Sequence, residues 1–163
     1  MNDKPRLPRR VGIRPLTVCQ WTERTPNATA TARTALRQIL VPLGFSEDRI
    51  DDIVLAVSEL VANATEHAPG PYALRLRRTA AEYVCEVEDM DPRLPQIPEF
   101  SAAGPFEGGT DGRGGGLDAL LVSLGERGRG LHIVEQLTGG AWGFTVCGAA
   151  KVAWVALPVR ASA

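Results

Sequence analysis

The sequence predicts an α+β two-layer sandwich, in which helices cover one face of a mixed, mostly antiparallel sheet. The chain has 163 residues, of which 44% are hydrophobic, and this suits one domain with a real core. Segments with strand-like alternation are interspersed with segments whose apolar residues recur at helical spacing. Their order is strand, helix, helix, two strands, loop, helix and two strands, which favours helices segregated to one side of the sheet.

The N-terminal part of the domain is expected to hold one strand and two helices. Residues 15–21 (PLTVCQW) have the composition of a short strand. Pro26 suits the first turn of a helix, which Gly44 then ends. Ser46 is a good cap for a second helix over residues 47–67, whose apolar residues form one long stripe.

Two strands and a glycine-rich loop follow. Residues 72–77 and 83–89 alternate along the chain, and the first of these strands is expected to have one solvated face. The stretch 101–116 is dominated by glycine and cannot bury enough apolar surface to order itself. A loop of that length inside a compact domain is usually functional or disordered, so we expect a mobile segment.

The C-terminal part is expected to close the sheet with a hairpin. Residues 117–124 suit a short helix, and a glycine-rich turn then leads into a helix over residues 130–137. The segments AWGFTVCG and KVAWVAL have strand patterns and are expected to turn at residues 148–150. The domain is therefore expected to span residues 15–158, followed by a tail over residues 159–163.

Composition argues against several classes of function. A formal net charge of −1 disfavours general nucleic-acid binding, which needs a strongly basic face. Cys19, Cys85 and Cys147 are far apart and form no CxxC pair, which predicts reduced thiols and a cytoplasmic location. No apolar run approaches the ~18 residues of a membrane span. Residues 1–14 are basic but lack the apolar stretch of a signal peptide, so we expect a flexible tail.

The second helix carries polar side chains on the side opposite its apolar stripe. Glu59 and Asn63 are four residues apart and lie one above the other, with Glu66 and His67 nearby. A solvated helix face is one interpretation. The apolar flanks of the helix favour another, because they suggest that it is covered nearly all round and that these groups need partners. The Asn63 oxygen suits Mg²⁺, and the Glu59 carboxylate could deprotonate a hydroxyl group.

Two further motifs carry chemistry. Asp89 ends a strand on its core-facing side, where a carboxylate needs a donor; an adenine amine is one candidate, and capping of the following turn is the alternative. Gly128 and Gly130 precede a helix, with Arg127 and Arg129 interleaved. Glycines allow close approach to a phosphate at a helix N-terminus, although a plain loop would have the same sequence.

The segments ELVANATEH, EVEDMDP and GERGRGLHIV occur in this order, with a glycine-rich loop before the third. Together they resemble the nucleotide-binding boxes of the GHKL ATPase superfamily, over roughly residues 15–158. Length and the C-terminal strands look most like the bacterial anti-sigma-factor serine/threonine kinases. The resemblance implies a Bergerat-type (histidine-kinase-like ATPase) fold that holds ATP between its helices and a lid over residues 101–116.

Residue roles follow from the resemblance by position. Glu59 would be the catalytic base, Asn63 the Mg²⁺ ligand and Asp89 the acceptor for the adenine amine. The phosphates would be cradled by Gly128, Arg129, Gly130 and Leu131. His67 matches a histidine common in the family, and we favour a helix-end hydrogen bond over catalysis for it. The superfamily's first glycine box usually reads Asp-x-Gly-x-Gly, whereas residues 89–92 here are Asp-Met-Asp-Pro.

The resemblance implies a Mg-ATP-dependent kinase that phosphorylates a serine or threonine of an antagonist protein and sequesters a sigma factor. It also implies a homodimer, with no direct contact to nucleic acid or membrane. A non-catalytic regulator that uses ATP to grip a partner is the alternative. An isolated histidine-kinase catalytic domain is disfavoured, because no dimerising helix with a phosphorylatable histidine precedes the boxes and the only histidines are His67 and His132.

Overall fold

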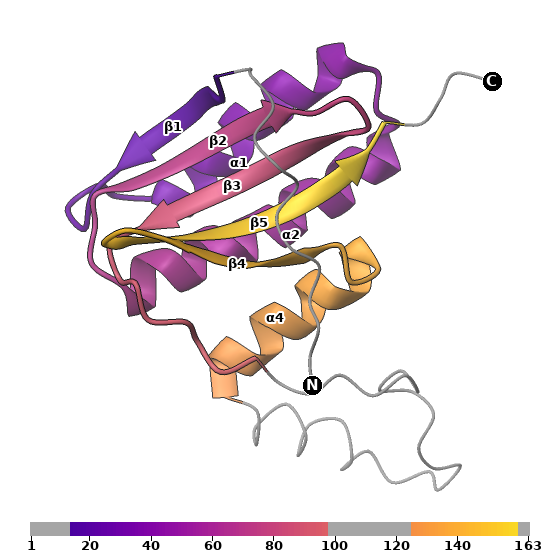
Figure 1. The fold of residues 1–163 in the computed structure, drawn as a ribbon. Coiled ribbons are helices and arrows are strands. Elements are labelled where there is room, and N and C mark those ends of the chain that lie inside the picture. The colour runs from indigo at the N-terminus through magenta and orange to yellow at the C-terminus, as the bar shows by residue number, and fades with distance from the viewer. Residues whose placement is uncertain (1–13, 98–124, 160–163) are drawn as a thin grey trace, which may run out of the picture.

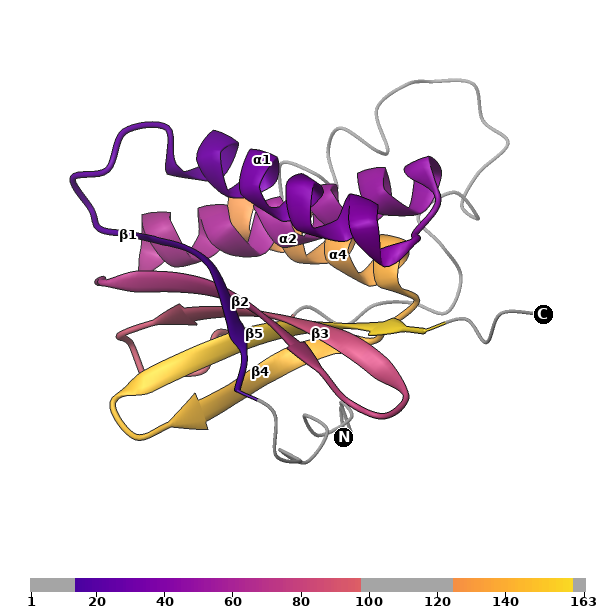
Figure 2. The same cartoon turned by 90° about the horizontal axis from the view of Figure 1, so that it is seen from above.

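The computed structural model describes residues 14–97 and 125–159 of the chain. In these residues five strands form one sheet, and three α-helices lie together on one of its faces (Figures 1 and 2). The α+β sandwich is therefore confirmed. Every neighbouring pair of described strands is antiparallel, so the mixed pairing expected from the sequence is not found in this part of the chain.

The sheet has the strand order β1-β2-β3-β5-β4. Its strands are β1 (Leu16–Trp21), β2 (Tyr72–Arg78), β3 (Glu82–Asp89), β4 (Trp142–Cys147) and β5 (Ala150–Pro158). The predicted closing hairpin is confirmed, with Cys147 paired to Ala150 across a turn at Gly148. β5 lies between β3 and β4. Because β5 runs antiparallel to β3, the start of this last strand lies beside the end of β3.

The helices are α1 (Ala28–Leu40), α2 (Glu47–His67) and α4 (Gly125–Thr138), with a short 3-10 turn at Val41–Leu43. Pro26 lies just before α1 rather than in its first turn, because Asn27 adopts a left-handed conformation at the N-cap. Gly44 ends the 3-10 turn with a φ of 81°, which explains why glycine stands there. The bounds of α2 are those that the sequence predicts. Ser46 occupies the N-cap position, but its side chain forms no capping hydrogen bond.

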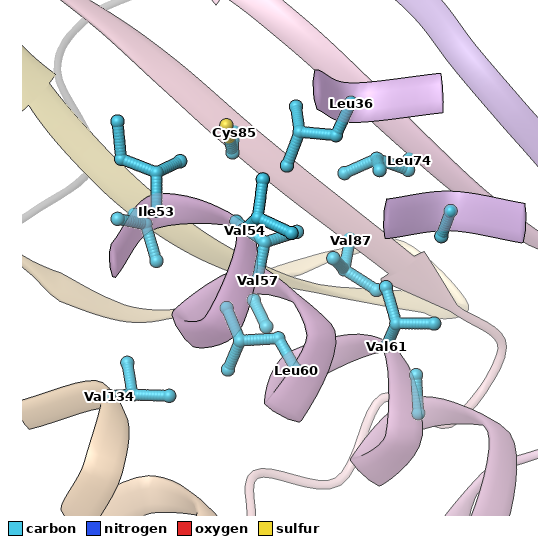
Figure 3. Packing of buried hydrophobic residues seen from close by; sticks show 14 of the residues in the cluster. Leu36, Ile53, Val54, Val57, Leu60, Val61, Leu74, Cys85, Val87 and Val134 are labelled. Atoms are coloured by element: carbon cyan, nitrogen blue, oxygen red, sulfur yellow. The ribbon is translucent and has the colours of Figure 1, made fainter. Parts of the chain in front are cut away.

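The core lies between the sheet and the helices. Figure 3 shows Leu36 of α1 and a row of α2 residues meeting Leu74, Cys85 and Val87 of the sheet, with Val134 of α4 beyond. The row on α2 consists of Ile53, Val54, Val57, Leu60 and Val61. The helix is thus buried on more than one side, as its apolar flanks predict, although Leu55 is 43% exposed.

The expectation of a solvated face on β2 is wrong. On the face of the sheet opposite the helices, Arg77 of β2 and Glu86 of β3 are both buried, and Arg77 Nε donates to Glu86 Oε1 at 2.9 Å. Val84 and Trp154 are buried on the same face. β2 lies between β1 and β3 in the sheet, so the Arg77 side chain is buried beside residues of β3, whereas Arg78 at the end of the strand stays exposed. The alternation of β2 alone does not reveal those neighbours.

All three cysteines are free, with Cys85 buried, Cys147 exposed and Cys19 between the two. Burial raises the pKa of Cys85 to about 12, so its thiol stays protonated at neutral pH. None of the described helices combines the length and the apolar character that a membrane crossing requires.

Gly143 of β4 pairs directly with Trp154 of β5, and this pairing leads to a prediction about stability. A Cβ atom on Gly143 would lie 2.9 Å from Cζ2 of the Trp154 indole. We expect Gly143→Ala to destabilise the protein by about 1–3 kcal/mol through overpacking, measured by urea unfolding.

A double-mutant cycle supplies the control, because phenylalanine lacks the part of the indole that clashes. In a Trp154→Phe background, Gly143→Ala should cost clearly less than in the wild type. An equal cost in both backgrounds would show that the strain lies elsewhere.

Candidate functional site

The polar motifs of the sequence converge on one cavity of about 670 Å³. Its wall includes Asn63 and His67 from α2, Asp89 from the end of β3, Leu131 from α4 and Lys151 from the start of β5. These residues are far apart in the sequence. The antiparallel pairing of β3 with β5 and the packing of α4 on α2 bring them to one end of the molecule.

Glu59 and Asn63 lie where α2 meets α4. A Cβ atom placed on Gly130 would approach Glu59 Oε2 to 2.9 Å, and both polar atoms of the Asn63 amide to 3.7 Å. Gly130 therefore lets the backbone of α4 come down onto these two side chains, which any larger residue would push aside. The structure thus brings Gly130 of the third sequence box against Glu59 and Asn63 of the first.

The Glu59 carboxyl has an altered acidity. Burial between the two helices raises its pKa, the negative charge of Glu66 raises it further, and Arg33 on α1 acts in the opposite direction. The side chains of Glu59 and Asn63 form no hydrogen bond or ion pair with another described residue. A carboxylate and an amide held side by side in this way are available to a ligand.

Asp89 lies on the core-facing side of β3, as its alternation predicts, and is 3% exposed. Its Oδ1 accepts a hydrogen bond from the Asp91 backbone N–H at 2.9 Å, so the turn-capping interpretation is confirmed. Its Oδ2 lies 3.3 Å from Lys151 Nζ. Burial raises the pKa of Asp89, while the Asp91 N–H and the Lys151 ammonium act against that rise.

Lys151 is the site residue that the sequence motifs did not reveal. It is one of two lysines in the chain, the other being Lys4. It occupies an inward position of β5. The alternate residues that follow it on the same face are the core residues Ala153, Val155 and Leu157. A lysine at such a position is unusual, because a buried ammonium group needs a partner. That alternation is the signal in the sequence that distinguishes Lys151 from an ordinary surface lysine.

The expected glycine-rich turn before the last helix is wrong as local structure. Helix α4 begins at Gly125, so Gly128, Arg129, Gly130 and Leu131 lie inside it. In an α-helix only the first four N–H groups lack a partner within the helix. The amides of residues 129–131 are therefore used by α4 in this conformation, and phosphate binding by this segment stays a prediction. Leu131 is buried and lines the cavity.

His67 does not form the expected helix-end hydrogen bond with any of the described residues. Its Nε2 lies 3.7 Å from the Glu66 carboxylate, and the side chain lines the cavity. The predicted lid over residues 101–116 and the short helix over residues 117–124 lie outside the described part of the chain. The predicted tails lie outside it too, apart from Arg14 and Val159.

Among the described residues, no group of three or more His, Cys, Asp or Glu side chains could hold a metal ion. Asn63 offers a single neutral oxygen at the edge of the cavity. That donor set fits Mg²⁺, which usually takes one or two protein ligands and completes its shell with water and phosphate oxygens. Asn63 and Asp89 both line the cavity, and Glu59 lies one helical turn before Asn63 on α2.

Comparison with known proteins gives an independent result. Residues 22–139 match the family model described as the histidine kinase-like ATPase domain. The matched range contains all three sequence boxes, and it ends one residue after α4. A comparison with curated proteins finds no significant match.

The site generates a prediction about acidity. Carboxyl-detected NMR titration should give Glu59 a pKa above the ordinary glutamate value, because burial disfavours the charged form. Glu66→Gln removes a neighbouring negative charge and should lower that pKa, whereas Arg33→Gln removes a positive charge and should raise it. Asp91 serves as an internal reference, because its hydrogen bonds with Arg93 lower its pKa to about 2. A Glu59 pKa unmoved by either substitution would contradict this electrostatic description.

Proposed function

Because the chain belongs to the histidine kinase-like ATPase family, whose domains bind ATP with Mg²⁺, we propose that it is a protein serine/threonine kinase of the anti-sigma type. Its substrate would be a serine or threonine hydroxyl of an antagonist protein. It would also bind and sequester a sigma factor. The observation that carries the proposal is the pair of Glu59 and Asn63 side chains, which lies against Gly130 and forms no hydrogen bond with any other described residue.

The residues fit a Mg-ATP ligand. Asn63 would hold Mg²⁺ through its amide oxygen, and a magnesium ion would neutralise charge on the phosphate groups. Asp89 would accept a hydrogen bond from the adenine amine at the buried wall of the cavity. Leu131 would contribute apolar surface where it lines the cavity. Gly128, Arg129 and Gly130 remain candidates for phosphate contacts.

Glu59 would act as the general base. Its carboxylate would accept the proton of the attacking hydroxyl group as the phosphoryl group is transferred. Partial burial brings the pKa of Glu59 closer to neutral and makes it a stronger base than an exposed glutamate. The working pH would lie above this pKa, where the carboxylate is ionised and can take up a proton.

A second candidate function is a regulator that binds ATP without transferring phosphate. Two observations favour it. Residues 89–92 lack the glycines usual in this box, and the amides of residues 129–131 are used within α4. ATP would then stabilise the fold and the grip on a partner protein. In either case we place the protein in the cytoplasm, as a homodimer that acts on proteins rather than on nucleic acid or membrane.

Glu59→Gln separates the two candidates. If Glu59 is the base, we expect transfer of labelled phosphate to fall by about 10²–10⁴-fold, because general-base catalysis contributes that much. ATP affinity should change far less. The matched control is Glu47→Gln, which removes an exposed carboxylate at the start of the same helix, away from the cavity. Transfer that is unchanged in Glu59→Gln would remove Glu59 as the base, and no transfer by the wild type with antagonist present would favour the regulator.

Thermal unfolding checks that Glu59→Gln still folds. The direction of the expected change in stability follows from the raised pKa of Glu59. The folded state holds the Glu59 proton more tightly than the unfolded state, so protonation of Glu59 stabilises the fold. This contribution to stability is fully present below the ordinary glutamate pKa. It is lost as the pH rises through the folded pKa. At neutral pH, therefore, Glu59→Gln should be at least as stable as the wild type in thermal unfolding.

Asn63→Ala tests the metal contact. We expect ATP affinity measured by calorimetry to fall by about tenfold or more in Mg²⁺ and to change little in EDTA, because only the metal-dependent part of binding passes through this amide. Gln38→Ala removes an amide on α1, away from the cavity, and should change neither value. A similar loss in Mg²⁺ and in EDTA would show that Asn63 does not act through the metal.

A further inference from the structure

We propose that Lys151 reads the base of the nucleotide, by donating a hydrogen bond to the ring nitrogen N1 beside the exocyclic amine. Asp89 would accept from that amine at the same time. The inference deepens the proposed function, and it rests on the cavity being the ATP site. It assigns a specificity role to a residue that none of the three sequence boxes contains.

Strand pairing fixes the position of Lys151. Its Cα lies directly across from that of Asp89 in the β3–β5 pair, and both side chains line the cavity. The side chains of Lys151 and Asp89 are 10% and 4% exposed. Removing two charges from water is costly, and an attraction of this kind does not usually repay that cost in stability. A buried pair facing a cavity is therefore better explained by a ligand than by the fold.

The hydrogen-bonding capacity of the pair is only partly used. An ammonium group has three N–H donors. Lys151 Nζ lies 3.3 Å from Asp89 Oδ2, and it donates to the Arg93 carbonyl oxygen at 3.3 Å. Within residues 14–97 and 125–159, nothing accepts from the third donor. Asp89 Oδ2 likewise has Lys151 as its one partner there, and a carboxylate oxygen can accept a second hydrogen bond.

The cavity wall thus presents an acceptor and a donor side by side. The Watson–Crick edge of adenine presents the complementary groups on neighbouring atoms, a donor at the N6 amine and an acceptor at N1. In the same orientation guanine would carry an oxygen where adenine has its amine, and that oxygen would face the Asp89 carboxylate. Asp89 and Lys151 together therefore match adenine, because each reads one of two adjacent atoms.

A purely structural role for Lys151 makes a different prediction. If Lys151 only neutralises Asp89, its loss should weaken every purine nucleotide to the same degree. If Lys151 donates to N1, its loss should matter only for nucleotides whose N1 is an unprotonated nitrogen that can accept a hydrogen bond. Ligands altered at a single ring atom therefore distinguish the two roles.

The experiment measures the dissociation constants of ATP, 1-deaza-ATP and 7-deaza-ATP by calorimetry in Mg²⁺, with the full chain and with Lys151→Met. The first analogue replaces N1 by C–H, and the second makes the same change at N7, as a matched control. We expect the wild type to bind 1-deaza-ATP about tenfold more weakly than ATP, since hydrogen bonds to charged groups are worth at least that factor. It should bind 7-deaza-ATP about as well as ATP.

Lys151→Met should bind ATP about tenfold more weakly and should no longer distinguish ATP from 1-deaza-ATP. If Lys151→Met does not fold, as judged by circular dichroism, Lys151→Ala provides the same comparison with a shorter side chain that also lacks a donor. The inference is overturned if the wild type binds ATP and 1-deaza-ATP equally, or if a folded Lys151 variant keeps the full difference between them. If the wild type binds no ATP at all, the proposed function fails together with this inference.

Discussion

The candidate site depends on the contact between α2 and α4. Gly130 has no side chain, so α4 can lie against the Glu59 carboxylate and the Asn63 amide. A residue with a Cβ at this position would displace the carboxylate, because Glu59 Oε2 is the nearest atom in its way. The sheet occupies another side of α2, so the helix has little freedom to move back. This close approach explains the altered acidity of Glu59, since burial is its largest cause.

Two buried charges, at the end of β3 and at the start of β5, form a second part of the candidate site. Asp89 and Lys151 face each other across two neighbouring strands, where burial and attraction act in opposite directions on the carboxyl pKa. One Asp89 oxygen holds the turn that follows β3, and the other remains at the cavity. The same side chain therefore shapes the backbone and presents an acceptor, so turn capping and ligand recognition are compatible roles rather than alternatives.

Each face of the sheet carries a buried pair of opposite charges, and the two pairs differ in how fully their hydrogen-bonding groups are used. On the face opposite the helices, the Arg77 side chain donates a hydrogen bond to Glu86, and both side chains are buried, as is Trp154 on the same face. On the helix face, Asp89 and Lys151 keep part of their hydrogen-bonding capacity for the cavity. Membership of the histidine kinase-like ATPase family agrees with the second arrangement, because a nucleotide base needs buried polar groups that are fixed in place but not fully used.

Local patterns in the sequence determined a large part of this protein. The stripe of α2, its Ser46 cap and the alternation of β3 predicted the helix bounds and the inward position of Asp89, because caps and periodicity act over a few residues. Tertiary structure alone decided that α4 begins at Gly125, that Arg77 is buried and that Lys151 meets Asp89. These features depend on which distant strands and helices become neighbours, and strand order and register are set by long-range packing that no short stretch of sequence contains.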